Sequence, residues 1–298
     1  MLSHALKTPR APNRAVVVGA GGFVGAAIAR ALQRRDVAVR PITRSDVDLL
    51  AEGAAEALAA LLDAEDAVVL VAAVAPVKTP AMLRDNITII EAMAEAVRRV
   101  RPAYCLNIGS DAVFADSTEP LSEASCRAPA SLHGIMHLAR EVMLAEALER
   151  QAFATLRPTL IYGADDPHNG YGPNRFRRLA AAGEPIALFG NGEERRDHVW
   201  VEDVAELAAR MVFQRSTGSL NAVTGQVISF HDLAGLIRVQ YGGPVEIVST
   251  PRSGPMPHNG YRPFDPGATT AAFPDFAYTL PEAGLAKVKA ELDGREGR

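Results

Sequence analysis

The sequence has few of the features that mark secreted, membrane or nucleic-acid-binding proteins. Its two cysteines, Cys105 and Cys126, are too few for a disulfide framework in 298 residues. The longest apolar run, residues 67–77, is too short to cross a bilayer. A formal net charge of −4 leaves no basic surplus for nucleic acid or for an anionic membrane. We therefore expect a cytoplasmic protein with no nucleic-acid and no membrane partner.

The N-terminal segment also lacks something, namely an apolar stretch that could serve as a secretion signal. Residues 1–13 carry His4, Lys7 and Arg10, and we expect them to form a loose, flexible tail. Apolar residues make up 48% of the chain, which is enough for a sizeable core. The length suits one large α/β domain or two unequal ones.

What the chain does have, near its start, is a valine-rich segment that runs into a cluster of glycines. Residues 16–18 are all valine and predict a buried strand, and a helix is expected to follow the glycines. A glycine turn between strand and helix lets backbone N–H groups and the positive end of the helix dipole meet a pyrophosphate. The residues expected to contact a dinucleotide here are Gly19, Gly22, Phe23, Val24 and Gly25. Val24 stands where the stricter G-x-G-x-x-G pattern has a small residue, and the alternative is a turn that binds nothing.

Strands and helices alternate over the first half of the chain, which predicts an α/β fold with a doubly wound parallel (Rossmann) sheet over residues 14–163. The expected strands are 14–18, 37–43, 67–71, 104–108 and 154–157, and the expected helices are 24–35, 51–64, 80–100 and 131–150. Turn-forming residues then become frequent, and residues 164–298 are expected to form a smaller mixed C-terminal substrate domain. Segments around 197–224 would return to the first domain. The other expected elements are helices at 174–183 and 280–293 and a mostly irregular segment at 249–267.

The end of the second expected strand bears on the choice of dinucleotide. An acidic residue there would bind a ribose hydroxyl and favour NAD, whereas an arginine favours the 2′-phosphate of NADP. Arg44 follows this strand, so NADP is favoured over NAD, and the alternative is an ordinary surface arginine. Asp48 could reach the adenine amino group. The small side chains of Ala72 and Ala73 would let the backbone lie against the cofactor.

In their order along the chain, these and later motifs resemble the NAD-dependent epimerase/dehydratase family, which belongs to the extended short-chain dehydrogenases/reductases. The resemblance covers roughly residues 14–290. The motifs are Gly19–Gly25, Asp66 with Ala72-Ala73, Asn86, Gly109–Phe114, Arg157-Pro158 with Tyr162-Gly163, Gly190-Asn191-Gly192 and Arg196–Val201. The resemblance implies a nicotinamide cofactor, which Asn86 and Pro158 would also contact. It also implies a sugar-nucleotide-like substrate in a cleft between the two domains.

The resemblance assigns the substrate end of that cleft to a small set of polar residues. Arg196 would bind a substrate diphosphate, although a surface ion pair with Glu193 or Asp197 is the alternative. The other expected substrate contacts are Tyr162, Asn174 and Arg262.

One departure from the family's pattern concerns the catalytic residues. The family combines a Ser or Thr with Tyr-x-x-x-Lys on one helix. Ser110 matches the first residue, but His133 and His137 replace the tyrosine and the lysine on one helical face. His133 could act as the acid/base without a cationic neighbour, with an ionisation near pH ~6.5. His137 could bind the nicotinamide ribose, while Tyr162 and Tyr171 are weaker candidates for a substitute acid.

Several hypotheses for this histidine pair remain open from the sequence. In the first, His133 preserves the redox chemistry. In the second, hydride chemistry is lost and the protein only binds cofactor or sugar nucleotide. In the third, the pair binds zinc, but no third ligand stands nearby in the sequence, so no metal is expected. In the last, the two histidines have no role.

The residues after Ser110 narrow the reaction that the resemblance implies. Dehydratases of the family have an Asp-Glu pair here, whereas this chain has Asp111 followed by Ala112, so a 4,6-dehydratase is not expected. The run is closer to reductases of 4-keto sugar nucleotides and to epimerases. Ser110 would then donate a hydrogen bond to a carbonyl, and the alternative is a hydroxyl that caps a strand end. By analogy with the family, helices 80–100 and 131–150 would form a homodimer.

Overall fold

A seven-stranded sheet forms the centre of the larger part of the protein, which the computed structural model describes over residues 2–149, 151–242 and 244–296. In spatial order the strands are β1 (Ser3–His4), β10 (Ser216–Ala222), β6 (Phe153–Pro158), β5 (Tyr104–Ile108), β4 (Ala67–Leu70), β2 (Ala15–Val18) and β3 (Val39–Ile42). All neighbouring strands are parallel except β1 and β10. The prediction of a doubly wound parallel sheet is confirmed.

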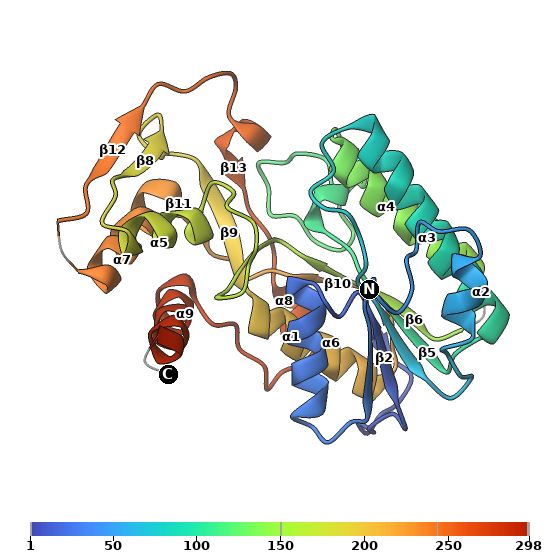
Figure 1. Ribbon diagram of the computed structural model, residues 1–298. Helices are drawn as coiled ribbons and strands as arrows, with labels where there is room; N and C mark the ends of the chain where they lie inside the picture. The colour runs from blue at the N-terminus through green and yellow to red at the C-terminus, as the bar shows by residue number, and fades with distance from the viewer. Residues whose placement is uncertain (1, 150, 243, 297–298) are drawn as a thin grey trace.

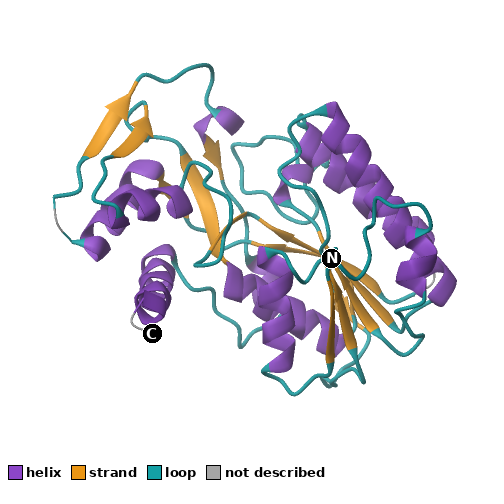
Figure 2. Ribbon diagram, in the orientation of Figure 1, coloured by secondary structure: helices purple, strands orange, loops and turns teal. Residues whose placement is uncertain are grey.

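Helices cover both faces of this sheet (Figures 1 and 2). One face carries α1 (Phe23–Gln33) and α6 (Val201–Gln214), and the other carries α2 (Ala54–Ala59), α3 (Pro80–Val100) and α4 (Leu132–Ala147). Alternate residues of β2 belong to the two cores, since Val17 packs on the side of α1 and Val16 on the side of α3. Because both faces are buried, the strand is apolar throughout, as the valine run indicated.

A smaller part, which includes most of the C-terminal half, contains two short sheets and three helices among its described residues (Figure 1). In the first sheet, β9 (Arg195–Trp200) pairs with β7 (Leu160–Tyr162), β11 (Val227–Ser229) and β13 (Tyr261–Arg262), and in the second, β8 (Ile186–Phe189) pairs with β12 (Ile247–Thr250). The helices are α5 (Pro173–Ala181), α7 (Phe230–Tyr241) and α9 (Pro281–Glu296). Between β9 and β11 the chain returns to the large sheet through α6 and β10.

The N-terminal segment is not the loose tail that the sequence indicated. Strand β1 pairs with β10, and three backbone N–H groups between residues 5 and 10 donate to carbonyl oxygens of residues 213–215. Nδ1 of His4 also lies 2.9 Å from the hydroxyl oxygen of Ser216. These contacts are made mainly by the backbone, so neither composition nor hydrophobic spacing could indicate them.

Two further expectations need correction. Helix α2 covers residues 54–59 rather than 51–64, because it begins after Gly53, whose φ of 76° is left-handed. The segment 249–267, expected to be mostly irregular, includes the end of β12, the 3₁₀ helix η2 (Pro257–Gly260) and β13. These elements are only two to four residues long, too short for a periodic pattern to reveal.

Candidate functional site

A cleft of about 1440 Å³ opens at the carboxyl ends of β2, β4 and β5. Strand β2 lies between β3 and β4, so the chain winds away from it in opposite directions, and doubly wound sheets bind ligands at such a point. The opposite wall comes from β9, η2 and the loop before α5. The cleft therefore lies between the large sheet and the smaller part.

All five glycine-turn residues that were expected to contact a dinucleotide line this cleft. Gly19 has a φ of 96°, and a Cβ on it would lie 2.6 Å from the backbone nitrogen of Ala72. A Cβ on Gly25 would overlap the carbonyl oxygen of Gly19. Gly22 caps α1 without a side-chain acceptor, so the N–H groups of the first helical turn remain available to an anion. The turn thus has the shape and polarity that a dinucleotide pyrophosphate requires.

Arg44 and Asp48 line the same cleft and bind each other. Nη2 of Arg44 donates to a carboxylate oxygen of Asp48 over 3.0 Å, and the other oxygen of Asp48 accepts from the backbone N–H of Leu50. The Leu50 N–H and the guanidinium lower the pKa of Asp48. The Arg44 side chain is 77% exposed, so it can reorient toward a ligand.

Asn86 does not line the cleft, which corrects its expected place as a direct cofactor contact. Its side chain accepts from the backbone N–H of Val74 at 2.9 Å and donates to the carbonyl oxygens of Val74 and Met82. Asn86 therefore holds the loop after β4 in place. Residues of that loop and of the end of β6 that do line the cleft include Ala72, Ala73 and Pro158.

A fully buried arginine supports the same loop, and sequence reasoning missed it. Arg140 of α4 donates to the side chain of Asn107 over 2.6 Å and to the carbonyl oxygens of Leu70 and Ala72 over 2.7 Å each. Burial lowers the pKa of Arg140 to about 10. One feature of the sequence could have indicated Arg140. It stands three residues after His137, so both lie on the face of α4 that turns toward the sheet.

His133 and His137 stand together on the first turns of α4 and both line the cleft. Their ring centroids are 4.7 Å apart with the planes at 89°. Nδ1 of His133 lies 3.4 Å from the backbone nitrogen of Val77, which can donate to it. Nδ1 of His137 has no hydrogen-bond partner among the described residues.

Burial keeps this histidine pair neutral. Desolvation lowers the pKa of His133, and Asp111 opposes that shift only in part. The pKa of His137 falls well below its ordinary value because of burial, with smaller effects from His133 and Arg140. The ionisation expected near pH ~6.5 for a free histidine is therefore displaced to lower pH.

Ser110 and Asp111 occupy the loop that faces the start of α4. The Ser110 hydroxyl accepts from the backbone N–H of Ala112 at 3.1 Å and lies 3.4 Å from a carboxylate oxygen of Asp111. It thus caps the 3₁₀ helix η1 (Asp111–Val113). A Cβ on Gly134 would overlap the carbonyl oxygen of Ala112, so this glycine allows α4 to lie directly against η1. That close approach brings Ser110 and the histidine pair to one end of the cleft.

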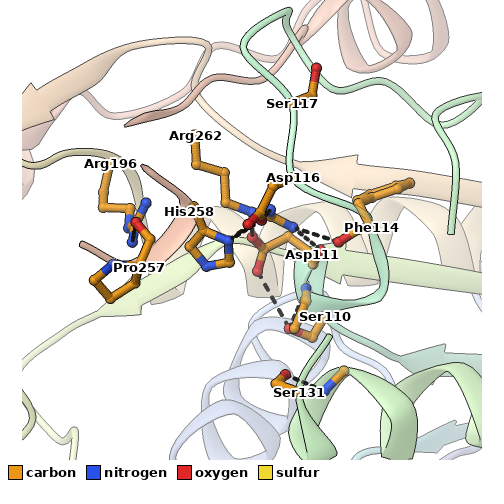
Figure 3. A network of polar contacts seen from close by, with 12 residues as sticks. Ser110, Asp111, Phe114, Asp116, Ser117, Ser131, Arg196, Pro257, His258 and Arg262 are labelled. Atoms are coloured by element: carbon orange, nitrogen blue, oxygen red, sulfur yellow. Dashed lines mark hydrogen bonds and ion pairs between the residues drawn. The ribbon is translucent and has the colours of Figure 1, made fainter. Parts of the chain in front are cut away.

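Arg196 and Arg262 line the wall of the cleft that the smaller part forms, and both are buried. Arg196 pairs with Glu194 at 2.5 Å, rather than with Glu193 or Asp197, which were the expected alternatives. Nη1 of Arg196 has no partner among the described residues. Arg262 donates to the carboxylates of Asp111 and Asp116 (Figure 3).

The remaining expected substrate contacts differ in their access to the cleft. Asn174 lines it and donates to Asp166. Tyr162 lies outside it, 1% exposed beneath Gly284 of α9, and burial raises its pKa, which corrects its place as a substrate contact or substitute acid. Tyr171 lines the cleft, and its hydroxyl accepts from the backbone N–H of Phe189.

Two histidines at the substrate end had no assigned role. His198 of β9 is 1% exposed, and neither ring nitrogen has a partner among the described residues. His258 of η2 contacts Asp116 (Figure 3). Both line the cleft. Both histidines reach the cleft because of how the strands of the smaller part are arranged, and the sequence alone does not reveal that arrangement.

The described part of the chain contains neither a cluster of metal-binding side chains nor a membrane-spanning helix. Within residues 2–149, 151–242 and 244–296, His, Cys, Asp and Glu side chains form no group of three or more that could hold a metal ion. Over the same residues, none of the helices combines the length and the apolar character that a membrane span needs.

The strand order, together with a glycine turn at the point where the winding reverses, defines a Rossmann-type α/β protein. The sequence pattern of the NAD dependent epimerase/dehydratase family matches residues 15–222, which are more than half of the chain. The protein therefore belongs to that family, and the resemblance inferred from its motifs is confirmed.

Curated relatives match over shorter segments. A dTDP-4-dehydro-6-deoxy-D-allose reductase from Streptomyces bikiniensis is 29% identical over 110 residues, 34% of this chain and 33% of the reductase. A dTDP-L-rhamnose 4-epimerase from Burkholderia thailandensis is 31% identical over 144 residues, 44% of this chain and 36% of the epimerase. The match thus spans about a third of the length of these relatives.

Solved structures of the same fold match over nearly the whole chain. A GDP-L-fucose synthetase from Naegleria fowleri bound to NADP has a TM-score of 0.80 and 16% identity, over 99% of this chain and 97% of that one. At this identity the likeness establishes the fold.

Proposed function

We propose that this protein is an NAD(P)-dependent oxidoreductase or epimerase that acts on a sugar nucleotide or a related carbohydrate, with His133 in place of the usual tyrosine. One observation carries the proposal: the glycine turn and the side chains of Ser110 and His133 line a single cleft. A dinucleotide with its pyrophosphate on the turn could therefore reach a substrate held beside these side chains.

The cofactor end fits a dinucleotide. Gly19 and Gly25 allow the turn to pack tightly against Ala72 and the start of α1, and among the described residues no side chain accepts from the first N–H groups of that helix. When bound, the nicotinamide would supply or accept a hydride. NADP is favoured over NAD because Arg44 could turn from Asp48 to a 2′-phosphate, and Asp48 could then bind the adenine amino group.

The tautomer of His133 indicates how it would hold a substrate oxygen by a hydrogen bond. To give that oxygen a proton, the ring must first become the imidazolium, because a neutral ring that lost a proton would become an imidazolate. If Nδ1 accepts from the Val77 N–H, the proton of the neutral ring stays on Nε2, which can donate to a substrate oxygen. The Ser110 hydroxyl would donate a second hydrogen bond to the same oxygen. His137 would hold the nicotinamide ribose through the edge of its ring that lines the cleft, since Nδ1 is fully buried.

The residues beside Ser110 favour carbonyl reduction or epimerisation over elimination of water. Elimination needs a second acid/base group next to Asp111, and Ala112 cannot supply one. Asp111 is also engaged by Arg262, through Nε at 3.0 Å, so it serves to position the loop. The two curated relatives, one a reductase and one an epimerase, support this choice.

The test is turnover of nicotinamide with a panel of 4-keto and 4-hydroxy sugar nucleotides, followed by nicotinamide absorbance and product analysis. The wild type should reduce or epimerise at least one member. His133→Phe should lose turnover by about a hundredfold or more, the usual contribution of a general acid/base, while it still binds cofactor. Exposed His231, remote from the cleft, is the control, and His231→Phe should turn over normally. Unchanged turnover in His133→Phe would remove this residue from the mechanism.

A second function, binding of cofactor or sugar nucleotide without catalysis, has one observation in its favour. Both histidines are held neutral by burial, and within the described part of the chain neither makes a carboxylate hydrogen bond that would assist proton transfer. In that case nicotinamide would bind, but its oxidation state would not change with any member of the panel.

We also propose a homodimer in a reducing compartment such as the cytoplasm. The side chains of Ile135 and Val142 lie seven residues apart on one face of α4 and are 43% and 59% exposed. Light scattering on the wild type and on Val142→Lys tests this: the wild type should be dimeric and the variant monomeric.

A further inference from the structure

Arg262, one of the expected substrate contacts, has no nitrogen left to bind a substrate anion. Nε donates to Asp111 over 3.0 Å, and Nη1 donates to Asp116 over 3.0 Å. Nη2 donates to the carbonyl oxygens of Asp111 and Phe114. With a side chain only 3% exposed, Arg262 ties the loop after η1 to β13 instead (Figure 3).

The positive and negative side chains around Arg262 are equal in number. Arg196, Arg252 and Arg262 pair with three carboxylates, those of Glu194, Asp111 and Asp116. With a neutral His258, this cluster carries no net charge. Two guanidinium nitrogens of the cluster have no partner among the described residues, Nη1 of Arg196 and Nε of Arg252, and Arg252 does not line the cleft. A diphosphate would therefore meet Nη1 of Arg196 together with three carboxylates. An additional positive charge is needed to hold such an anion.

His258 is placed to provide that charge. Nδ1 contacts Asp116, and in Figure 3 the other ring nitrogen points away from that carboxylate. The neighbouring Pro257 accepts from Nη2 of Arg196 at 3.0 Å, so η2 rests on the Arg196 guanidinium. His258 lines the cleft with its side chain 35% exposed.

We propose that His258, oriented by Asp116, is an ionisable ligand for the anionic group of the substrate beside Nη1 of Arg196, so that binding of a diphosphate takes up one proton. This inference rests on the proposed function, because it assumes a sugar-nucleotide substrate. It identifies how that site would recognise a diphosphate although Arg262 is fully engaged.

The tautomer explains the proton uptake. A carboxylate only accepts hydrogen bonds, so the contact with Asp116 requires a proton on Nδ1 of His258. Nη1 of Arg262 lies 3.1 Å from the same nitrogen, and in this tautomer it donates to Asp116 instead. In the neutral ring Nε2 is then an acceptor, and it would repel a phosphate oxygen. Protonation converts Nε2 into a charged donor, which attracts the phosphate.

The groups around His258 determine its pKa. Burial lowers its pKa, the hydrogen bond to Asp116 raises it, and Arg262 on β13 and Arg196 on β9 lower it. The net result is a lowered pKa, so the ring is neutral near pH 7. A bound diphosphate adds negative charge and raises the pKa, so affinity rises as the pH falls.

The experiment measures the affinity of UDP-glucose and dTDP-glucose by calorimetry from about pH 5.5 to about pH 8. Histidines ionise in this range, whereas the diphosphate groups of the two sugar nucleotides do not. For the wild type, the affinity should fall by up to about tenfold per pH unit as the pH rises. Calorimetry in buffers of different ionisation enthalpy should show uptake of close to one proton. His258→Gln, a neutral variant, should bind with a flat pH profile.

Two further variants test whether the pH dependence comes from His258. His231→Gln changes an exposed histidine that does not line the cleft and should keep the wild-type profile. Asp116→Asn removes the carboxylate that raises the pKa of His258, so the profile should move to lower pH. A flat wild-type profile, or an unchanged slope in His258→Gln, would overturn the inference and leave the proposed function standing. Absence of binding at every pH would overturn the inference and the sugar-nucleotide assignment together.

Discussion

The two ends of the cleft are prepared for negative charge in different ways. At the cofactor end the glycine turn presents backbone N–H groups, and its side-chain charges form one exposed pair, Arg44 with Asp48. At the substrate end, buried arginines are already paired with carboxylates, and histidines stand beside them. Backbone groups do not titrate, whereas ion pairs and histidines do. Affinity for NAD, which carries no phosphate monoester, should therefore be nearly constant over the pH range in which substrate affinity changes.

The largest effect is expected where the backbone itself forms the site. In Gly25→Ala the new Cβ overlaps the Gly19 carbonyl oxygen, so the turn must move. We expect loss of dinucleotide binding and a decrease of about 3 kcal/mol in the free energy of unfolding. Gly235 of α7 is the control, because a Cβ there meets no atom within 4 Å. Calorimetry and denaturant unfolding check both variants, and normal dinucleotide affinity in Gly25→Ala would contradict the account.

The next effect concerns the support beneath the cofactor loop. Arg140→Met removes the donors to Leu70, Ala72 and Asn107 and leaves their buried oxygens unpaired. We expect a loss of about 2–4 kcal/mol in the free energy of unfolding, with weaker cofactor binding as the loop shifts. Arg98→Met, on the exposed face of α3, should cost less than about 0.5 kcal/mol. Equal effects of the two substitutions on unfolding would show that Arg140 does not hold the loop.

At the substrate end, His198 should make stability depend on pH. Burial lowers the pKa of His198 to about 4, below the value of about 6.5 expected in the unfolded chain. Between these values the unfolded state binds the proton and the folded state does not, so stability is lost as the pH falls from about 6.5 to about 4. The loss should reach roughly 3 kcal/mol near pH 4 and should disappear in His198→Phe. Urea unfolding over this range tests it, with His231→Phe as the control; parallel profiles for wild type and His198→Phe would refute this role.

The smallest effect is expected at the exposed pair. Arg44→Ser should reduce the preference for NADP over NAD by about tenfold, since one exposed charge contributes on the order of 1 kcal/mol. Arg40→Ser, on the neighbouring strand β3 outside the cleft, should leave the preference unchanged. The measurement is the ratio of dissociation constants for the two dinucleotides. If Arg44→Ser leaves this ratio unchanged, Arg44 is an ordinary surface arginine that does not select between the two dinucleotides.

Much of the fold was predictable because the larger part follows simple rules. The valine strand, the glycine turn and the long helices α3 and α4 each carry a strong local pattern, and parallel sheets favour a small set of topologies. The same patterns placed Ser110, His133 and His137 on neighbouring elements, and the structure brings all three to the cleft.

The rest depends on contacts between distant parts of the chain. Arg140 and Asn86 act on backbone carbonyl or amide groups that no sequence pattern identifies. Asp116 and His258 are 142 residues apart, and Arg262 becomes saturated only because η1 and β13 meet. Tyr162 stands in a family motif, yet α9 covers it, since packing of a distant helix decides its exposure.

The most direct test of the central claim is a crystal structure with NADP bound. The account predicts the pyrophosphate on the backbone of Gly22 and Phe23 and the nicotinamide beside Ser110 and His133. A dinucleotide found away from the glycine turn, or a nicotinamide directed away from the histidine pair, would contradict it.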